Sequence, residues 1–109
     1  MKISFDFDST LAENRIQLLC KKLMDDGHDI YVTTTRLHKM PNGIVLENRD
    51  LFATCKKMNI PKENIRFTNG NDKYHILNGF DIHFDDDQIE IDLINENVDG
   101  CVGVLIFDP

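Results

Sequence analysis

The chain has no tryptophan, and only three of its 109 residues are cysteine and three are proline. The cysteines, Cys20, Cys55 and Cys101, are far apart and odd in number, so they predict neither a disulfide framework nor a metal-binding cysteine cluster. We expect three buried thiols in a reducing compartment, which favours the cytoplasm. No apolar run has the length of a membrane span, and the first residues do not resemble a signal peptide.

Basic residues are also scarce, because 12 lysines and arginines stand against 19 acidic residues, for a net charge of −7. This balance argues against nonspecific binding to nucleic acid and against an anionic membrane surface. It does not exclude a phosphate ligand, because a bound divalent metal reverses the local charge. The length and the 41% hydrophobic content predict a single globular domain over residues 1–109, and no pattern indicates a homo-oligomer.

Short apolar segments alternate along the chain with segments of helical periodicity. Residues 88–97 fit either a strand or a helix, and we favour a helix because Asp87 and Glu90 form an aspartate variant of the capping box. Pro-Asn-Gly within residues 36–48 predicts a long loop. The alternation is typical of an α/β domain with a mostly parallel sheet. The predicted strands are 2–7, 28–35, 64–68, 80–84 and 102–107, and the other predicted helices are 13–27, 49–59 and a short one that follows 69–72 and ends near Asn78.

Polar residues follow four of the predicted strands. Asp6 and Asp8 belong to "FDFDST", where strand alternation would place both carboxylates on one face. The second strand ends in "VTTTR", Lys73 begins the short helix after the third strand, and "FDDDQ" places Asp85 and Asp86 after the fourth. Because ligands bind beyond the carboxyl ends of parallel strands, we expect these groups to converge at one edge of the sheet.

Each group alone has an ordinary structural explanation. Asp87 suits a helix N-cap, threonine is common in strands, and the Lys73 side chain could extend into water. A lysine at the positive end of a helix is nevertheless unfavourable by ~0.3–1 kcal/mol, and a bound phosphate would compensate. Together the groups supply a nucleophile, a second carboxylate, a hydroxyl, a lysine and an acid pair suited to Mg²⁺. These are the parts needed for phosphoryl transfer through an aspartyl-phosphate.

The four segments, in this order, resemble the four motifs of the haloacid dehalogenase (HAD) superfamily of phosphohydrolases. "FDFDST" is similar to the first motif, "VTTTR" to the second, "NDKYHIL" to the third and "DIHFDDD" to the fourth, so the resemblance covers residues 3–87. It implies a three-layer, Rossmann-like domain with a five-stranded sheet. The segment after the first motif and the 36–48 loop are too short for an inserted domain, so the chain is similar to minimal, capless members.

The resemblance implies a magnesium-dependent phosphatase and a role for each residue. Asp6 would attack the phosphorus of a phosphorylated substrate. Asp8 would protonate the leaving oxygen and then activate water. Mg²⁺ would bind Asp6, the Asp8 backbone carbonyl and one of Asp85 and Asp86, and the phosphoryl group would bind Lys73 and either Thr34, which the T-x-R pattern favours, or Thr33.

The substrate class stays open. Capless relatives often act on large or open substrates, and Arg36, directly after the second strand, is the best candidate for contacting the rest of a substrate such as a nucleotide. His38, Lys39 and Arg49 are further candidates. The four histidines show no metal-ligand spacing, so we expect them at ordinary strand or surface positions.

Two other functions compete with a phosphatase. The chain could be a phosphate- or Mg²⁺-binding regulatory or scaffold module without turnover, although pure binding needs no general acid such as Asp8. A receiver-like phosphoacceptor domain shares the parallel sheet and a set of Asp, Thr and Lys. It is disfavoured because the third predicted strand is followed by no aspartate until Asp72.

Overall fold

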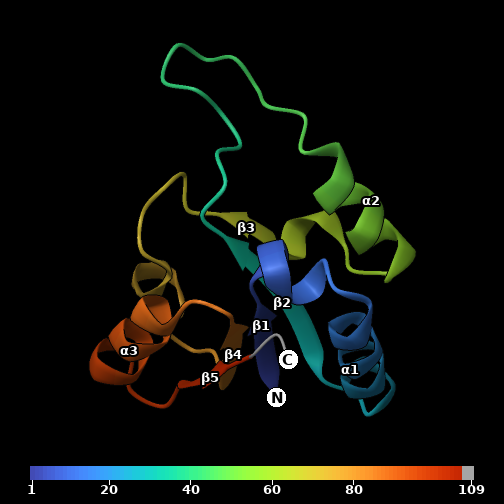
Figure 1. Ribbon diagram of the computed structural model, residues 1–109, viewed down its shortest axis with the longest axis vertical. Coiled ribbons are helices and arrows are strands. Elements are labelled where there is room, and N and C mark those ends of the chain that lie inside the picture. The colour runs from blue at the N-terminus through green and yellow to red at the C-terminus, as the bar shows by residue number, and fades with distance from the viewer. Residues whose placement is uncertain (107–109) are drawn as a thin grey trace.

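A single five-stranded sheet forms the centre of the computed structural model, which describes residues 1–106 (Figure 1). Its strand order is β3-β2-β1-β4-β5, and all neighbouring strands are parallel. The predicted α/β class and five-stranded sheet are confirmed. The strands are β1 (Lys2–Phe5), β2 (Asp29–Thr34), β3 (Ile65–Phe67), β4 (Ile82–Asp85) and β5 (Val102–Leu105).

Helices cover both faces of the sheet, so the described residues form three layers compatible with a Rossmann-like fold. α1 (Asn14–Asp25) and α2 (Arg49–Lys57) lie on one face, and α3 (Gln88–Asn97) lies on the other (Figure 1). In the part of the chain that the structure describes, none of the helices has the length and apolar character needed to span a bilayer. Three short helical turns complete the fold: η1 (Phe7–Leu11), η2 (Lys62–Asn64) and η3 (Lys73–Ile76).

The predicted elements are present, but several end earlier than expected. The first strand ends at Phe5, and the chain then turns sharply through η1, where Ser9 adopts a left-handed backbone with φ of 58°. Strand alternation therefore does not relate Asp6 to Asp8, because both residues lie beyond the end of β1. η3 is a single turn rather than a helix to Asn78. Residue 107, predicted in the last strand, lies outside the described residues.

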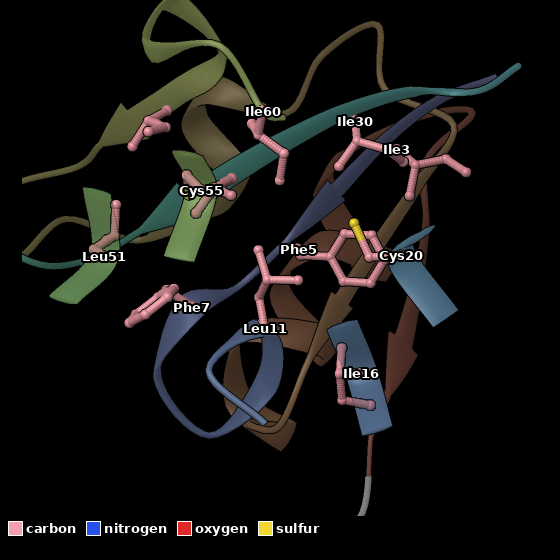
Figure 2. Close-up of a cluster of buried hydrophobic side chains, with 12 residues drawn as sticks. Ile3, Phe5, Phe7, Leu11, Ile16, Cys20, Ile30, Leu51, Cys55 and Ile60 are labelled. Atoms are coloured by element: carbon pink, nitrogen blue, oxygen red, sulfur yellow. The ribbon is translucent and has the colours of Figure 1, made fainter. Parts of the chain in front are cut away.

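A hydrophobic core fills the space between the sheet and the layer of α1 and α2 (Figure 2). Alternate residues of β1, Ile3 and Phe5, point into it, and Phe5 stacks on Phe84 with ring centroids 4.9 Å apart. All three cysteines are buried free thiols, as predicted. Burial raises the pKa of Cys20 to about 12 and that of Cys55 to about 11, so both stay protonated at neutral pH.

A second core lies beneath α3. The helix predicted over 88–97 is confirmed, and Asp87 caps it by accepting a hydrogen bond from the Ile89 backbone N–H at 2.9 Å. Its buried face includes Glu90 and Ile94, whereas Ile89 is 70% exposed. Ile94 packs with Leu77, Phe80, Val98 and Cys101.

The two isoleucines of α3 provide a matched test of this packing. Replacing the fully buried Ile94 (I94A) leaves a cavity and should lower the free energy of unfolding by ~2–5 kcal/mol. Replacing the exposed Ile89 (I89A) should change it by no more than about 0.5 kcal/mol. Urea unfolding followed by circular dichroism measures both, and equal losses would show that the helix faces the sheet differently.

Candidate functional site

A cavity of about 410 Å³ opens at the carboxyl edge of the sheet. It lies where β1 and β4 are neighbours, which is the point where the strand order reverses and where open α/β sheets bind ligands. The expected convergence of residues from four strand ends is therefore present in the structure. The cavity is lined by Asp6, Asp8, Ser9, Thr35, Lys73, Asp85, Asp86, Asp87, Gln88 and Glu90.

Lys73 is the centre of the site. Its ammonium group donates to Asp6 Oδ1 at 2.8 Å and to Asp85 Oδ2 at 2.5 Å, and the residue is only 3% exposed. Its backbone N–H donates to the buried Glu90 carboxylate at 3.1 Å. The side chain thus turns inward instead of extending into water, and the two carboxylates offset its unfavourable place at the start of η3.

Asp85, the last residue of β4, is held on both carboxylate oxygens. Oδ2 accepts from Lys73 and from His83 Nε2 at 2.8 Å, and Oδ1 accepts from the Asp87 backbone N–H at 3.2 Å. Burial opposes ionisation, but the hydrogen bond from His83 and the charge of Lys73 lower the pKa of Asp85 to about 2. Because Oδ2 already has two donors, Oδ1 is the oxygen left with room for a further ligand.

The electrostatic environment of Asp6 differs from that of Asp85. Burial and the nearby Asp85 charge raise the pKa of Asp6 to about 8, against the opposing effect of Lys73. Oxygen atoms of Asp6, Asp85 and the exposed Asp86 all lie within 4.8 Å of one another. Three acidic side chains share one lysine, and a divalent cation would favour the ionised form of Asp6, so this donor set fits a divalent cation that prefers oxygen ligands.

Asp8 lines the same cavity but has a different partner. Its side chain is 58% exposed and forms two hydrogen bonds with Arg36, from Nε at 3.0 Å and from Nη2 at 2.7 Å. Arg36 also bonds Asp50 on α2. The structure thus brings Asp6 and Asp8 to one cavity, one paired with a buried lysine and the other with a partly exposed arginine.

The three threonines of "VTTTR" have different surroundings. Thr33 is buried and shares a hydrogen bond of 2.7 Å with Ser4. Thr34 is buried, and its hydroxyl accepts from the Arg36 backbone N–H at 3.2 Å. Thr35 is the one of the three that lines the cavity. The assignment of a phosphate ligand to Thr34 or Thr33 stays a prediction, and the cavity adds Thr35 as a candidate.

Sequence reasoning missed two buried groups at the site. His83 was expected at an ordinary strand position, but its imidazole is buried against Asp85, and burial lowers its pKa, so it is neutral and donates from Nε2. Glu90 was assigned to the capping box, yet its carboxylate bonds Lys73 instead. The contact of His83 with Asp85 could have been predicted, because residues two apart on a strand point to the same face of the sheet. No local signal identified the contact of Glu90 with Lys73.

The candidates for substrate contact, Arg36 included, lie outside the cavity lining. His38 stacks on Phe67 with ring centroids 4.7 Å apart, and Arg49 is largely exposed and pairs with Glu47 at 2.6 Å.

Comparison of the chain with protein-family models, with curated proteins and with solved structures found no match. The residues of the site and their geometry are therefore the basis for a functional proposal.

Replacing Lys73 tests whether the ammonium group neutralises the site. K73M leaves Asp6 and Asp85 buried without a cation and should lower the free energy of unfolding by ~3–5 kcal/mol in the presence of chelator. K57M removes an exposed lysine and should have little effect. Urea unfolding gives both values, and wild-type stability for K73M would rule out this role.

Replacing His83 tests whether Asp85 belongs to a cation site. H83L removes the hydrogen bond that orients the Asp85 carboxylate and should weaken Mg²⁺ binding by about 10- to 100-fold. H75Q changes an exposed histidine and should bind as the wild type does. Isothermal titration calorimetry with Mg²⁺ measures the dissociation constants. Equal affinity for wild type and H83L would remove Asp85 from the site.

Proposed function

We propose that the chain is a Mg²⁺-dependent phosphatase that hydrolyses phosphomonoesters through an aspartyl-phosphate on Asp6. The observation that carries the proposal is the position of the Asp6 carboxylate. It lies in a cavity at the carboxyl edge of the sheet, within 2.8 Å of a buried ammonium group and close to two further acids. A nucleophile that attacks phosphorus needs cations nearby, because negative charge gathers on the phosphoryl oxygens, and Lys73 together with a divalent cation held by the acids would supply them.

The proposed reaction has two steps. In the first, an Asp6 oxygen attacks phosphorus, the bond from phosphorus to the leaving oxygen breaks, and Asp8 donates its proton to that oxygen. In the second, Asp8 takes a proton from water, the water oxygen attacks phosphorus, and the bond to Asp6 breaks. Inorganic phosphate leaves, Asp6 is restored as a carboxylate, and Asp8 is protonated again.

The chain's own residues supply much of the charge balance. Lys73 lines the cavity and has a third N–H besides those that bond Asp6 and Asp85, so it is the proposed donor to a phosphoryl oxygen, and a hydroxyl from Thr34, Thr33 or Thr35 is the candidate for a second donor. Mg²⁺ held by Asp6, Asp85 and Asp86, with the Asp8 carbonyl as the family resemblance implies, would neutralise charge on the phosphoryl group. The buried acids of the site outnumber the single ammonium group of Lys73. A bound cation would therefore offset the negative charge that Lys73 leaves unpaired.

The strand order supports a HAD-like, capless domain over a receiver. The order β3-β2-β1-β4-β5 places the strand that carries Asp6 at the centre, next to β4. Flavodoxin-like domains, which include receivers, have the order 2-1-3-4-5, with their third strand at the centre. The described part of β3 ends at Phe67 and is followed by Thr68, so no acid stands at that strand end.

Asp6→Asn provides the direct test of the nucleophile. The wild type should hydrolyse p-nitrophenyl phosphate or members of a phosphomonoester panel with Mg²⁺, and chelator should abolish turnover. D6N should lose activity to the background rate while keeping its circular dichroism spectrum, because the amide cannot form the aspartyl-phosphate. D26N, which changes an exposed acid at the end of α1, should keep full activity.

Each other outcome has a definite meaning. Full activity in D6N would eliminate the proposed mechanism. No turnover on any ester, from a folded wild type that binds Mg²⁺, would favour the phosphate- or Mg²⁺-binding module.

A further inference from the structure

Every hydrogen-bond donor of the Arg36 side chain is engaged within the protein. A guanidinium group has five N–H donors. Nε and Nη2 donate to the two oxygens of Asp8 at 3.0 and 2.7 Å. Nη1 and Nη2 donate to the two oxygens of Asp50 at 2.7 and 2.8 Å, and Nη1 also donates to Asn48 Oδ1 at 3.4 Å. No N–H is left for a substrate.

We infer that Arg36, held by Asp50 and Asn48, is a positioning residue that sets the Asp8 carboxylate for proton transfer. We call these four residues the Arg36 clamp. The inference rests on the proposed function and changes one expectation from the sequence, in which Arg36 contacts the substrate. Through the clamp, two residues at the start of α2 take part in the reaction without reaching the cavity.

The clamp is built on well-packed parts of the fold. Asp50 precedes Leu51, which is fully buried, so the core fixes the helix that presents the Asp50 carboxylate. The Arg36 guanidinium also lies over the Phe7 ring, 5.0 Å from its centroid, and Phe7 is buried next to Asp8. The planar guanidinium donates paired hydrogen bonds along two of its edges and stacks on an aromatic ring, so it has little rotational freedom.

Asp8 needs such support because its own surroundings do not hold it. It lies in η1, is 58% exposed, and precedes Ser9 with its left-handed backbone. An exposed carboxylate samples several rotamers, and misplacement of a reacting group by about 1 Å can cost 100-fold in rate. Two parallel hydrogen bonds from one rigid group restrict both its position and its plane, and each Asp8 oxygen keeps a second lone pair for the transferred proton. Arg36 lowers the pKa of Asp50 to about 2, so Asp50 stays ionised across the neutral range.

The test variant is D50A, which removes the support of Arg36 and touches neither Asp6 nor the cavity. We expect kcat to fall by about 10- to 100-fold, with KM and Mg²⁺ affinity close to wild type. The loss should be larger for alkyl phosphates than for p-nitrophenyl phosphate, because an alkoxide leaving group needs the Asp8 proton and nitrophenolate does not. A general loss of folded protein would lower both rates equally.

Two controls complete the kinetic test. E47A removes the exposed ion pair between Glu47 and Arg49 on the same segment and should leave both rates unchanged. In a D8N background, D50A should have no further effect, because the group it positions is gone. Multiplied losses in the double variant, or a raised KM with unchanged kcat, would overturn the inference and return Arg36 to substrate binding.

A measurement without substrate separates this inference from the proposed function. In the ¹⁵N spectrum of the wild type, the Arg36 Nε–H signal should be resolved and should exchange slowly with water. The signal should be shifted in D8N, and in D50A it should exchange quickly and move toward the averaged position of a mobile arginine. If the wild type hydrolyses no phosphoester but shows this pattern, the phosphatase proposal fails while the clamp on Asp8 stands. An averaged Nε–H signal in the wild type would show that the clamp does not exist.

Discussion

The contact of one buried ammonium group with two carboxylates connects the parts of this fold that the site requires. Lys73 comes from η3, Asp6 from the end of β1 and Asp85 from the end of β4, and Glu90 of α3 fixes the backbone of the lysine. Removing charges from water is costly, and only a close, hydrogen-bonded arrangement recovers that free energy. The strand ends and the α3 layer must therefore keep their relative positions for the lysine to stay buried.

The two acids of "FDFDST" differ in burial and in their hydrogen-bond partners, although only one residue separates them in the sequence. Asp6 is buried among charges of both signs, whereas Asp8 is largely exposed and shares an arginine with Asp50. Burial raises the pKa of Asp6 to about 8, so the proposed nucleophilic role needs a bound cation that favours its ionised form. The sharp turn at Ser9 produces the difference between the two acids, because it takes Asp8 out of the strand while returning it to the same cavity.

Much of the fold could be predicted, because alternating strands and helices specify a parallel sheet, and a parallel sheet brings its carboxyl ends together. Sheet topology therefore predicts Asp6, Lys73 and Asp85 at one edge. Prediction from the sequence fails where tertiary contacts override the local pattern. Glu90 satisfies a capping motif in sequence yet bonds another element, and Arg36 meets Asp50 only once α2 has docked on the sheet. Long-range pairs of this kind leave no periodic signal.

Hydrogen bonds join the two ends of the loop formed by residues 36–48, so the outer part of this loop can change in length independently of its ends. Arg36 bonds Asn48, and Asn48 Nδ2 donates to the Leu37 carbonyl at 3.0 Å, so the two ends of the loop are joined there. Its outer part is a tight turn in which Met40 bonds Ile44. Doubling the length of a flexible loop costs only ~0.6 kcal/mol. The outer turn is thus a suitable point for inserting a longer segment, because the contacts that fix Asp6 and Asp8 lie outside it.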